Sequence, residues 1–194
     1  MKAIIDTSSL LSFCRYYLPF DKNSHLFNLI KNKIEFGDII VIDKVMDECA
    51  AVANGHVLTS MPYLKDPKFL KGAKCPVKTD TITASNHAQF LEQVDRDFQD
   101  QSVRRLKKIN EAEYVVQKGI FMNSADMRMI LTCLNLKERG KKGEEVILVS
   151  EESRSLNDSK IFKKIPIICN YVGIQTLTLP RIFEHHYKLK VQFS

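Results

Sequence analysis

The chain has 194 residues, of which 44% are hydrophobic, a content that suffices for a core and is too high for a disordered chain. No run approaches the roughly 20 consecutive apolar residues of a membrane-spanning helix. The carboxylate of Asp6 interrupts the first apolar stretch, which argues against a signal peptide. We therefore expect a cytoplasmic protein without a membrane segment. The net charge of +6 favours a polyanionic partner, although ordinary basic proteins share it.

The cysteines are widely spaced and form no Cys-x-x-Cys pair, which predicts reduced, buried thiols and no zinc site. They are Cys14, Cys49, Cys75, Cys133 and Cys169.

The first part of the chain alternates short apolar runs with helical periodicity. The pattern predicts a strand at 2–6, a helix from about residue 10, a helix at 25–34, a strand at 38–42 and a helix at 43–54. Such β-α-β-α order is typical of a parallel sheet with helices on both faces.

The rest of the chain is less regular at first. Prolines and lysines predict an irregular segment at about 55–80, followed by a long or broken helix over 86–118. The later pattern predicts a helix at 125–136, a strand at 146–149, a helix at 166–171, a strand at 174–179 and a final helix after Pro180. We interpret 1–194 as one α/β domain with a central, mostly parallel sheet and an irregular and helical insertion at about 55–118.

Acidic residues stand where the carboxyl ends of the strands are expected, which is where α/β sheets bind ligands. Asp6 ends the first strand, and Glu151 and Glu152 follow the strand at 146–149. Asp126 lies in the first turn of its helix, and Glu48 lies one turn into the helix after the second strand. Clustered carboxylates repel one another until a cation neutralises them, and oxygen ligands suit Mg²⁺ or Mn²⁺. Such ions activate water for phosphodiester cleavage.

Each acid also has a purely structural interpretation. Asp6 could cap a helix, and Asp126 could be a favourable charge at a helix N-terminus. Glu48 could be an ordinary solvated helix residue, and Glu151 and Glu152 could be loop charges. The joint placement of these acids at strand ends is what favours a site.

The same residues resemble the motifs of the PIN-domain nuclease family. Four segments match in order, namely Ile4-Ile5-Asp6-Thr7-Ser8, Ile42-Asp43-Lys44-Val45-Met46-Asp47-Glu48, Ser124-Ala125-Asp126 and Leu148-Val149-Ser150-Glu151-Glu152. The resemblance implies a three-layer α/β/α fold and a metal-dependent endoribonuclease. Its catalytic acids would be Asp6, Glu48, Asp126 and Glu152, with metal held by Asp6, Asp126, Glu152 and Glu151 and with Ser8 and Ser150 in supporting roles.

Two departures from the family pattern bear on activity. The fourth acid is commonly Asp and is Glu152 here, and Ser8 stands where many members have Asn. The tail, with Val149-Ser150-Glu151-Glu152 followed by segments 164–169 and 172–174, is similar to a bacterial subgroup of toxin-like PIN proteins. That resemblance implies the toxin of a toxin–antitoxin pair, a small antitoxin protein as partner, and a homodimer.

Two basic clusters are candidate RNA-binding surfaces. The loop at 55–80 interleaves lysines with Tyr63 and Phe69, which suits backbone contact and base stacking, or simply a solvated surface. The predicted contacts are Lys65, Lys68 and Lys71 in this loop and Arg104 and Arg105 on the following helix. The second cluster comprises Arg104, Arg105, Lys107 and Lys108, and it fits either a groove for RNA or an acidic antitoxin segment.

Two rival functions remain on sequence grounds. A catalytically weakened PIN-like protein would bind RNA through its basic surfaces without cutting it. A phosphatase using Asp6 as nucleophile is the third hypothesis, although no second Asp follows two residues later and no Gly-rich phosphate loop is present.

Overall fold

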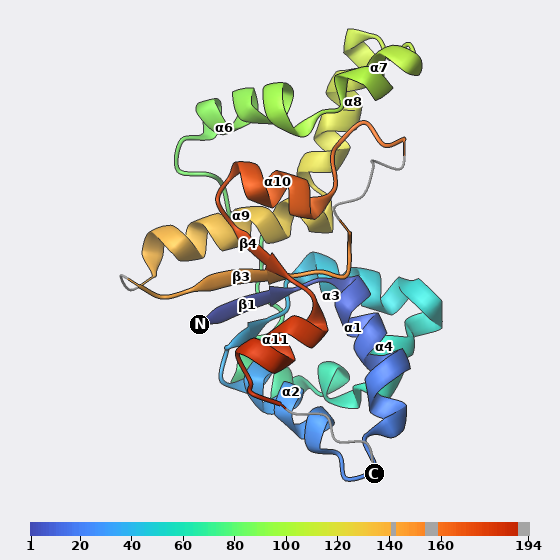
Figure 1. The fold of residues 1–194 in the computed structure, drawn as a ribbon, viewed down its shortest axis with the longest axis vertical. Helices are drawn as coiled ribbons and strands as arrows, with labels where there is room; N and C mark the ends of the chain where they lie inside the picture. Colours follow the sequence, from blue (N-terminus) through green and yellow to red (C-terminus); the bar gives the residue numbers. More distant parts are fainter. Residues whose placement is uncertain (141–142, 154–158, 190–194) are drawn as a thin grey trace.

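The computed structural model describes residues 1–140, 143–153 and 159–189 and shows an α/β protein built around a parallel sheet (Figure 1). Within these residues, four strands form the sheet in the order β2-β1-β3-β4. The strands are β1 (Lys2–Ile5), β2 (Ile39–Ile40), β3 (Val146–Val149) and β4 (Gln175–Leu177). Every neighbouring pair runs parallel, so all carboxyl ends lie at one edge. The expected α/β class and parallel sheet are confirmed.

Helical segments make up most of the remaining chain. They are α1 (Thr7–Ser12), η1 (Phe13–Tyr17), η2 (Leu18–Phe20), α2 (His25–Glu35), α3 (Asp43–Ala51), η3 (Val52–Gly55), α4 (His56–Ser60), η4 (Pro62–Lys65), α5 (Pro67–Ala73), α6 (His87–Gln93), η5 (Val94–Phe98), α7 (Gln101–Leu106), α8 (Glu111–Met122), α9 (Ala125–Arg139), α10 (Ile165–Tyr171) and α11 (Leu179–His185).

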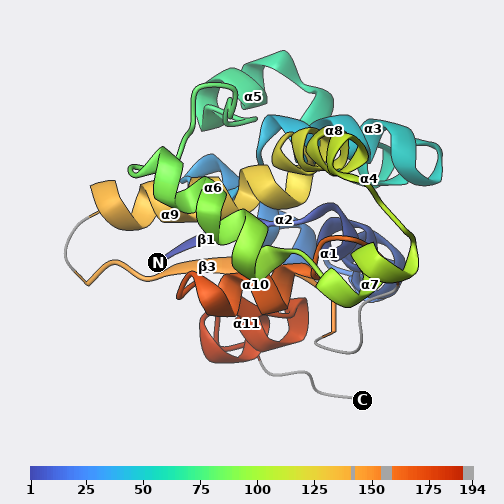
Figure 2. The ribbon, with the colours of Figure 1, turned by 90° about the horizontal axis from the view of Figure 1, so that it is seen from above.

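Helices cover the sheet on both sides. α9 and α10 lie on one face, and α1, α2 and α11 lie on the other (Figure 1). The segment with α6, α7 and α8 lies farther out, and Figure 2 shows α6 crossing over α9 and α10. The central strands β1 and β3 are therefore almost entirely buried, which explains why all their residues after Lys2 are apolar.

Most of the buried hydrophobic residues belong to one core that includes all five cysteines as free thiols, as expected from their spacing. The apolar stripe Phe90, Val94 and Phe98 is also buried in this core. Among the described residues, no helix is long and apolar enough to cross a membrane.

The expectation of an irregular segment at 55–80 was wrong for most of its length. Residues 56–73 fold as α4, η4 and α5. Pro67 begins α5 rather than breaking it, and the preceding Asp66 caps the helix by accepting a hydrogen bond from the Lys68 amide at 2.9 Å. Proline suits the first turn because the N–H it lacks would have no partner there.

The predicted helix over 86–118 is broken twice. η5 ends where Gln99 pairs with Phe162 in an isolated antiparallel bridge, and Asp100 then caps α7. Asn110 and Glu113 form a capping box at the start of α8. The apolar periodicity of this region is real, but the caps divide it into separate helices.

Asp43 ties the edge of the sheet to the following chain. Its carboxylate is buried and accepts hydrogen bonds from the Thr79 hydroxyl at 2.6 Å, the Thr79 amide at 3.1 Å and the Lys44 amide at 2.9 Å. Nearby, Val77 forms an isolated parallel bridge with Ile42, which extends the sheet beyond β2. Burial acts to raise the pKa of Asp43, but these hydrogen bonds outweigh it and the pKa is lowered.

We expect Asp43→Ala to lower the free energy of unfolding by about 2–4 kcal/mol, because it leaves buried donors of Thr79 without partners. Because the pKa of Asp43 is lowered in the folded protein, the ionised carboxylate stabilises the fold at a pH above 3.8, its pKa in the unfolded chain. This stabilisation is lost as the pH falls below that value. Urea denaturation at neutral and acidic pH measures both effects. Asp47→Ala, at an exposed position of the same helix, is the control, and equal stability of the two variants would contradict the assignment.

Candidate active site

Asp6 lies at the carboxyl end of β1, beside the end of β3. Its amide donates to the Val149 carbonyl at 3.0 Å, which continues the ladder between these strands. The carboxylate is buried and caps α1, accepting from the Ser9 amide at 2.6 Å and from the Ser8 hydroxyl at 2.8 Å. The helix thus begins at Thr7, earlier than expected. Asp6 is a helix cap, and the cap also fixes its position at the edge of the sheet.

Glu48 and Asp126 come from the two helices that pack against each other next to this edge, α3 and α9. Glu48 is exposed, and the hydroxyl of Thr7 donates to its Oε2 at 2.5 Å, so the residue after Asp6 orients it. Asp126 follows the Ser124 cap in the first turn of α9 and is partly buried. Within the described residues, the Asp126 carboxylate accepts no hydrogen bond.

The paired acids after β3 point in different directions. Glu152 accepts through Oε2 from the Ile165 amide at the start of α10, at 3.0 Å, and its own amide donates to the buried Ser150 hydroxyl at 3.2 Å. Glu151 accepts through Oε1 from the Leu179 amide of α11 at 2.8 Å and from the Ser9 hydroxyl at 3.5 Å. Glu152 therefore lies next to Asp126, whereas Glu151 is directed towards α11.

Electrostatics links four of the acids. Burial is the largest cause that raises the pKa of Asp126, and neighbouring carboxylates raise it further, to about 7. Those carboxylates are Glu152, Glu48 and Asp6, while Lys160 acts in the opposite direction. The four acids proposed as catalytic therefore lie near enough for Asp126 to sense the charges of the other three, and Glu151 does not contribute to this effect.

Asp126 and Glu152 line a cleft of about 430 Å³ between α8, the start of α9 and the segment at 160–164. Its other walls carry apolar side chains, including Phe121 and Phe162, whose rings stack at 4.0 Å with an interplanar angle of 2°. The basic residues that line it are Lys107, Lys160, Lys163 and Lys164. An acidic end, a basic rim and an aromatic wall are the elements of a site for a nucleic-acid strand.

Lys107 belongs to the second basic cluster named from the sequence, whereas Lys160, Lys163 and Lys164 were not among the sequence candidates. These three stand within five residues shortly after Glu152, and that spacing was the available signal. The predicted Lys65, Lys68 and Lys71 are exposed on η4 and α5 and do not line the cleft. Tyr63 and Phe69 are buried, and their ring centroids lie 4.9 Å apart, so neither ring is placed to stack on a base. The base-stacking alternative for this region was therefore wrong.

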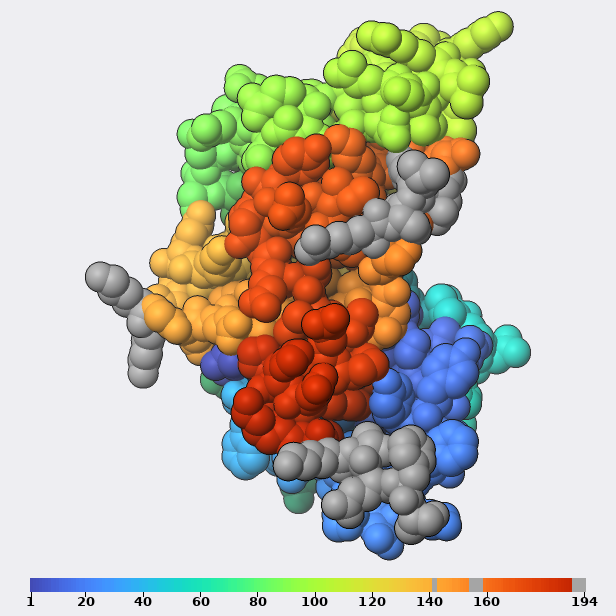
Figure 3. Space-filling view, in the orientation of Figure 1, coloured from blue at the N-terminus to red at the C-terminus, as the bar shows by residue number. Residues whose placement is uncertain are grey.

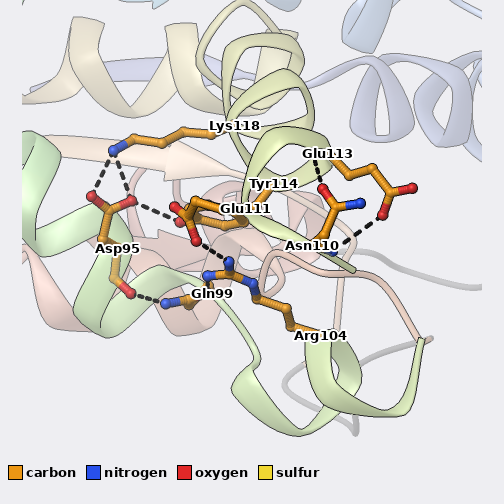
Figure 4. A network of polar contacts seen from close by, with 8 residues as sticks. All are labelled: Asp95, Gln99, Arg104, Asn110, Glu111, Glu113, Tyr114 and Lys118. Carbon is orange, nitrogen blue, oxygen red and sulfur yellow. Dashed lines mark hydrogen bonds and ion pairs between the residues drawn. The ribbon is translucent and has the colours of Figure 1, made fainter. Parts of the chain in front are cut away.

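The two predicted arginines of α7 have different environments. Figure 4 shows Arg104 inside a polar network that joins η5, α7 and α8. Its guanidinium lies 4.1 Å from the centre of the Tyr114 ring and pairs with Glu111, and the Tyr114 hydroxyl donates to Asp95 at 2.7 Å. Arg104 therefore has partners within the protein. Arg105 is exposed and, with Arg104 and Lys108, lines a smaller hollow of about 290 Å³ that borders the cleft through Ile109.

The donor chemistry of the acids suits Mg²⁺ or Mn²⁺, because every candidate ligand is a carboxylate oxygen. Glu48 and Glu152 each keep one carboxylate oxygen that accepts no hydrogen bond from the described residues. Neither carboxylate oxygen of Asp126 accepts a hydrogen bond from them. Among the described residues, however, no three acidic, histidine or cysteine side chains are grouped closely enough to hold a metal ion. A bound cation would therefore require side-chain movement that draws the acids together.

The position of Glu151 leads to a prediction. We expect Glu151→Ala to lower the free energy of unfolding by about 0.5–2 kcal/mol, because α11 loses the acceptor at its first amide. Cleavage of RNA should change only slightly, since this carboxylate points away from Asp126. Thermal melts and cleavage rates test this, with Glu151→Gln as the variant that keeps an acceptor. A hundredfold loss of cleavage in both variants would instead make Glu151 a metal ligand.

Fold and site together define an α/β protein with a cluster of acids at the carboxyl edge of a parallel sheet. Comparisons with models of known protein families, with curated proteins and with solved structures gave no match. The acids and the cleft beside them are therefore the basis for a function.

Proposed function

We propose that the protein is a metal-dependent endoribonuclease with a three-layer, PIN-like α/β/α fold. The observation that carries this proposal is that Asp126 interacts electrostatically with Asp6, Glu48 and Glu152, acids from four separate motifs near the edge where β1 and β3 end. The basic cleft that begins at Asp126 and Glu152 supports a nucleic-acid substrate. The order of the four motifs in the sequence supports the PIN family.

The four acids would hold Mg²⁺ or Mn²⁺, and the neighbouring hydroxyls position them. Thr7 holds Glu48, Ser8 holds Asp6, and Ser150 holds the backbone of Glu152. When bound, the cation supplies a Lewis acid that stabilises charge on the phosphodiester. Burial and the neighbouring carboxylates raise the pKa of Asp126 to about 7, so a bound cation would favour its ionised form.

The cleft determines how the substrate would approach the acids. Lysine side chains along it neutralise backbone phosphates, and the Phe121–Phe162 stack offers an apolar wall to unpaired bases. A single-stranded RNA fits this combination better than a duplex, whose bases are already stacked. The toxin role, with an antitoxin partner and a homodimer, rests on the sequence resemblance alone.

The second candidate is a PIN-like protein that binds RNA without cutting it. The favouring observation is that Asp6, Glu48 and Glu152 already accept protein hydrogen bonds and are not grouped as metal ligands. One experiment distinguishes the two functions: it measures both RNA cleavage and RNA binding, in Mn²⁺ and in EDTA. Metal-dependent cutting identifies the nuclease, and tight binding without cutting in either condition identifies the binding protein.

A further inference from the structure

A second, smaller hollow lies on the other side of Glu152 from the cleft. It has a volume of about 190 Å³ and lies where β3 and β4 end and α11 begins. Its polar lining consists of Ser150, Glu152, Thr176, Thr178 and Arg181. The α10–β4–α11 segment forms a continuous part of the surface shown in Figure 3. Glu152 lines both hollows, so a ligand crossing it would occupy both.

The polar side chains of this hollow are rich in unused hydrogen-bond donors. Thr178 is the N-cap residue of α11, and its side chain makes no capping bond, while the first helical amide donates to Glu151. Within the described residues, the side chains of Thr176, Thr178 and Arg181 form no hydrogen bond. Ser150 accepts one from the Glu152 amide, and its own hydroxyl proton has no acceptor there.

This chemistry fits a phosphate group. A guanidinium presents paired N–H donors that match two phosphate oxygens, and hydroxyl groups supply further donors. Arg181 is exposed, so its charge is available at the mouth of the hollow. The lysines of the cleft lie on one side of Glu152, and Arg181 lies on the other.

We propose that this hollow binds a backbone phosphate of the RNA strand on the far side of the cleavage site, with Arg181 as its positioning residue. The proposal rests on the proposed ribonuclease function, because it assumes that the strand passes over Glu152. It assigns the strand two anchor regions, one formed by lysines and the other by Arg181, with the acids between them. Arg181 contacts a flanking phosphate and not the bond that is cleaved.

The test measures binding of a labelled single-stranded RNA oligomer in EDTA, where no cleavage takes place. Arg181→Gln should weaken binding about tenfold. It should also reduce the slope of log K against log salt by about 0.7, the value for one lost phosphate contact on a single strand. Arg181→Lys should restore the salt slope, since it keeps the charge, and only part of the affinity, since it lacks the paired donors. Arg139→Gln, at the exposed end of α9, should match the wild type.

Two further measurements test the proposal, one with oligomers that differ at the 5′ end and one of the kinetics of cleavage. Oligomers with a 5′-hydroxyl and with a 5′-phosphate should respond equally, and an effect confined to the phosphorylated end would overturn the proposal. If the wild type cleaves RNA in Mn²⁺, Arg181→Gln should raise KM with kcat nearly unchanged. Equal affinity of wild type and Arg181→Gln, or no RNA binding by the wild type, would also overturn it. Binding without cleavage would reject the nuclease and leave the phosphate site in place.

Discussion

Asp126→Asn should abolish metal-dependent RNA cleavage while making the metal-free protein more stable. Changes to groups that only support a metal ligand cost about 10–100-fold, so removal of a ligand charge should cost at least about 100-fold. The gain in stability has a separate cause. Burial is the largest cause that disfavours the charged Asp126 carboxylate, and repulsion from Glu152, Glu48 and Asp6 adds to it, so the uncharged amide relieves both.

The gain should be on the order of 1 kcal/mol, which raises Tm by about 2–4 °C for a chain of this size. Added Mn²⁺ should raise the Tm of the wild type and have much less effect on Asp126→Asn, because a ligand stabilises only a state that binds it. Differential scanning fluorimetry with and without Mn²⁺ measures both shifts. Asp47→Asn is the matched control, as an exposed acid next to Glu48 in sequence. A variant less stable than the wild type would contradict the repulsion between these acids.

Glu152→Gln should also reduce cleavage by at least about 100-fold, but with little change in stability. The reason is that the Gln side chain retains an oxygen that can accept from the Ile165 amide, so the start of α10 keeps its partner. Only the negative charge next to Asp126 is lost. Parallel cleavage assays and thermal melts of wild type, Glu152→Gln and Glu151→Gln separate the two neighbouring acids.

The outcome decides which of the two carboxylates acts as the fourth acid of the proposed site. Loss of cleavage in Glu152→Gln alone supports Glu152 in that role. Loss in Glu151→Gln alone would show that Glu151 turns away from α11 when a cation binds.

The sheet could be predicted because each of its strands is recognisable from its own short apolar sequence. Buried parallel strands need apolar residues on both faces, and the runs at 2–6, 38–42 and 146–149 are apolar and short. The Ser124 cap of α9 was equally local and was confirmed, with the Ser124 hydroxyl accepting from the Met127 amide at 3.3 Å. The breaks near Gln99 and the folding of 56–73 were missed, since the first depends on a bridge to the distant Phe162 and the second on prolines at helix starts.

In the site, too, features that depend on local sequence could be predicted, and those that depend on distant contacts could not. Asp6 and Glu152 could be placed together because each follows a strand, and strands of a parallel sheet end at one edge. Lys160, Lys163 and Lys164 could not be assigned, because only the folded path of 160–164 across α8 and α9 brings them next to Asp126. The different directions of Glu151 and Glu152 were also beyond the sequence, since they depend on the amides of α11 and α10.

The central claim is that these acids form one cation site that cleaves RNA, and the most direct test compares wild type with Asp6→Asn on a mixed panel of single-stranded and structured RNAs in Mn²⁺. Asn caps a helix as well as Asp does, so the bond from the Ser9 amide and the start of α1 should survive while the charge is lost. We predict cleavage by the wild type that EDTA abolishes and no cleavage by Asp6→Asn. Equal cleavage by both proteins, or cleavage that persists in EDTA, would contradict the claim.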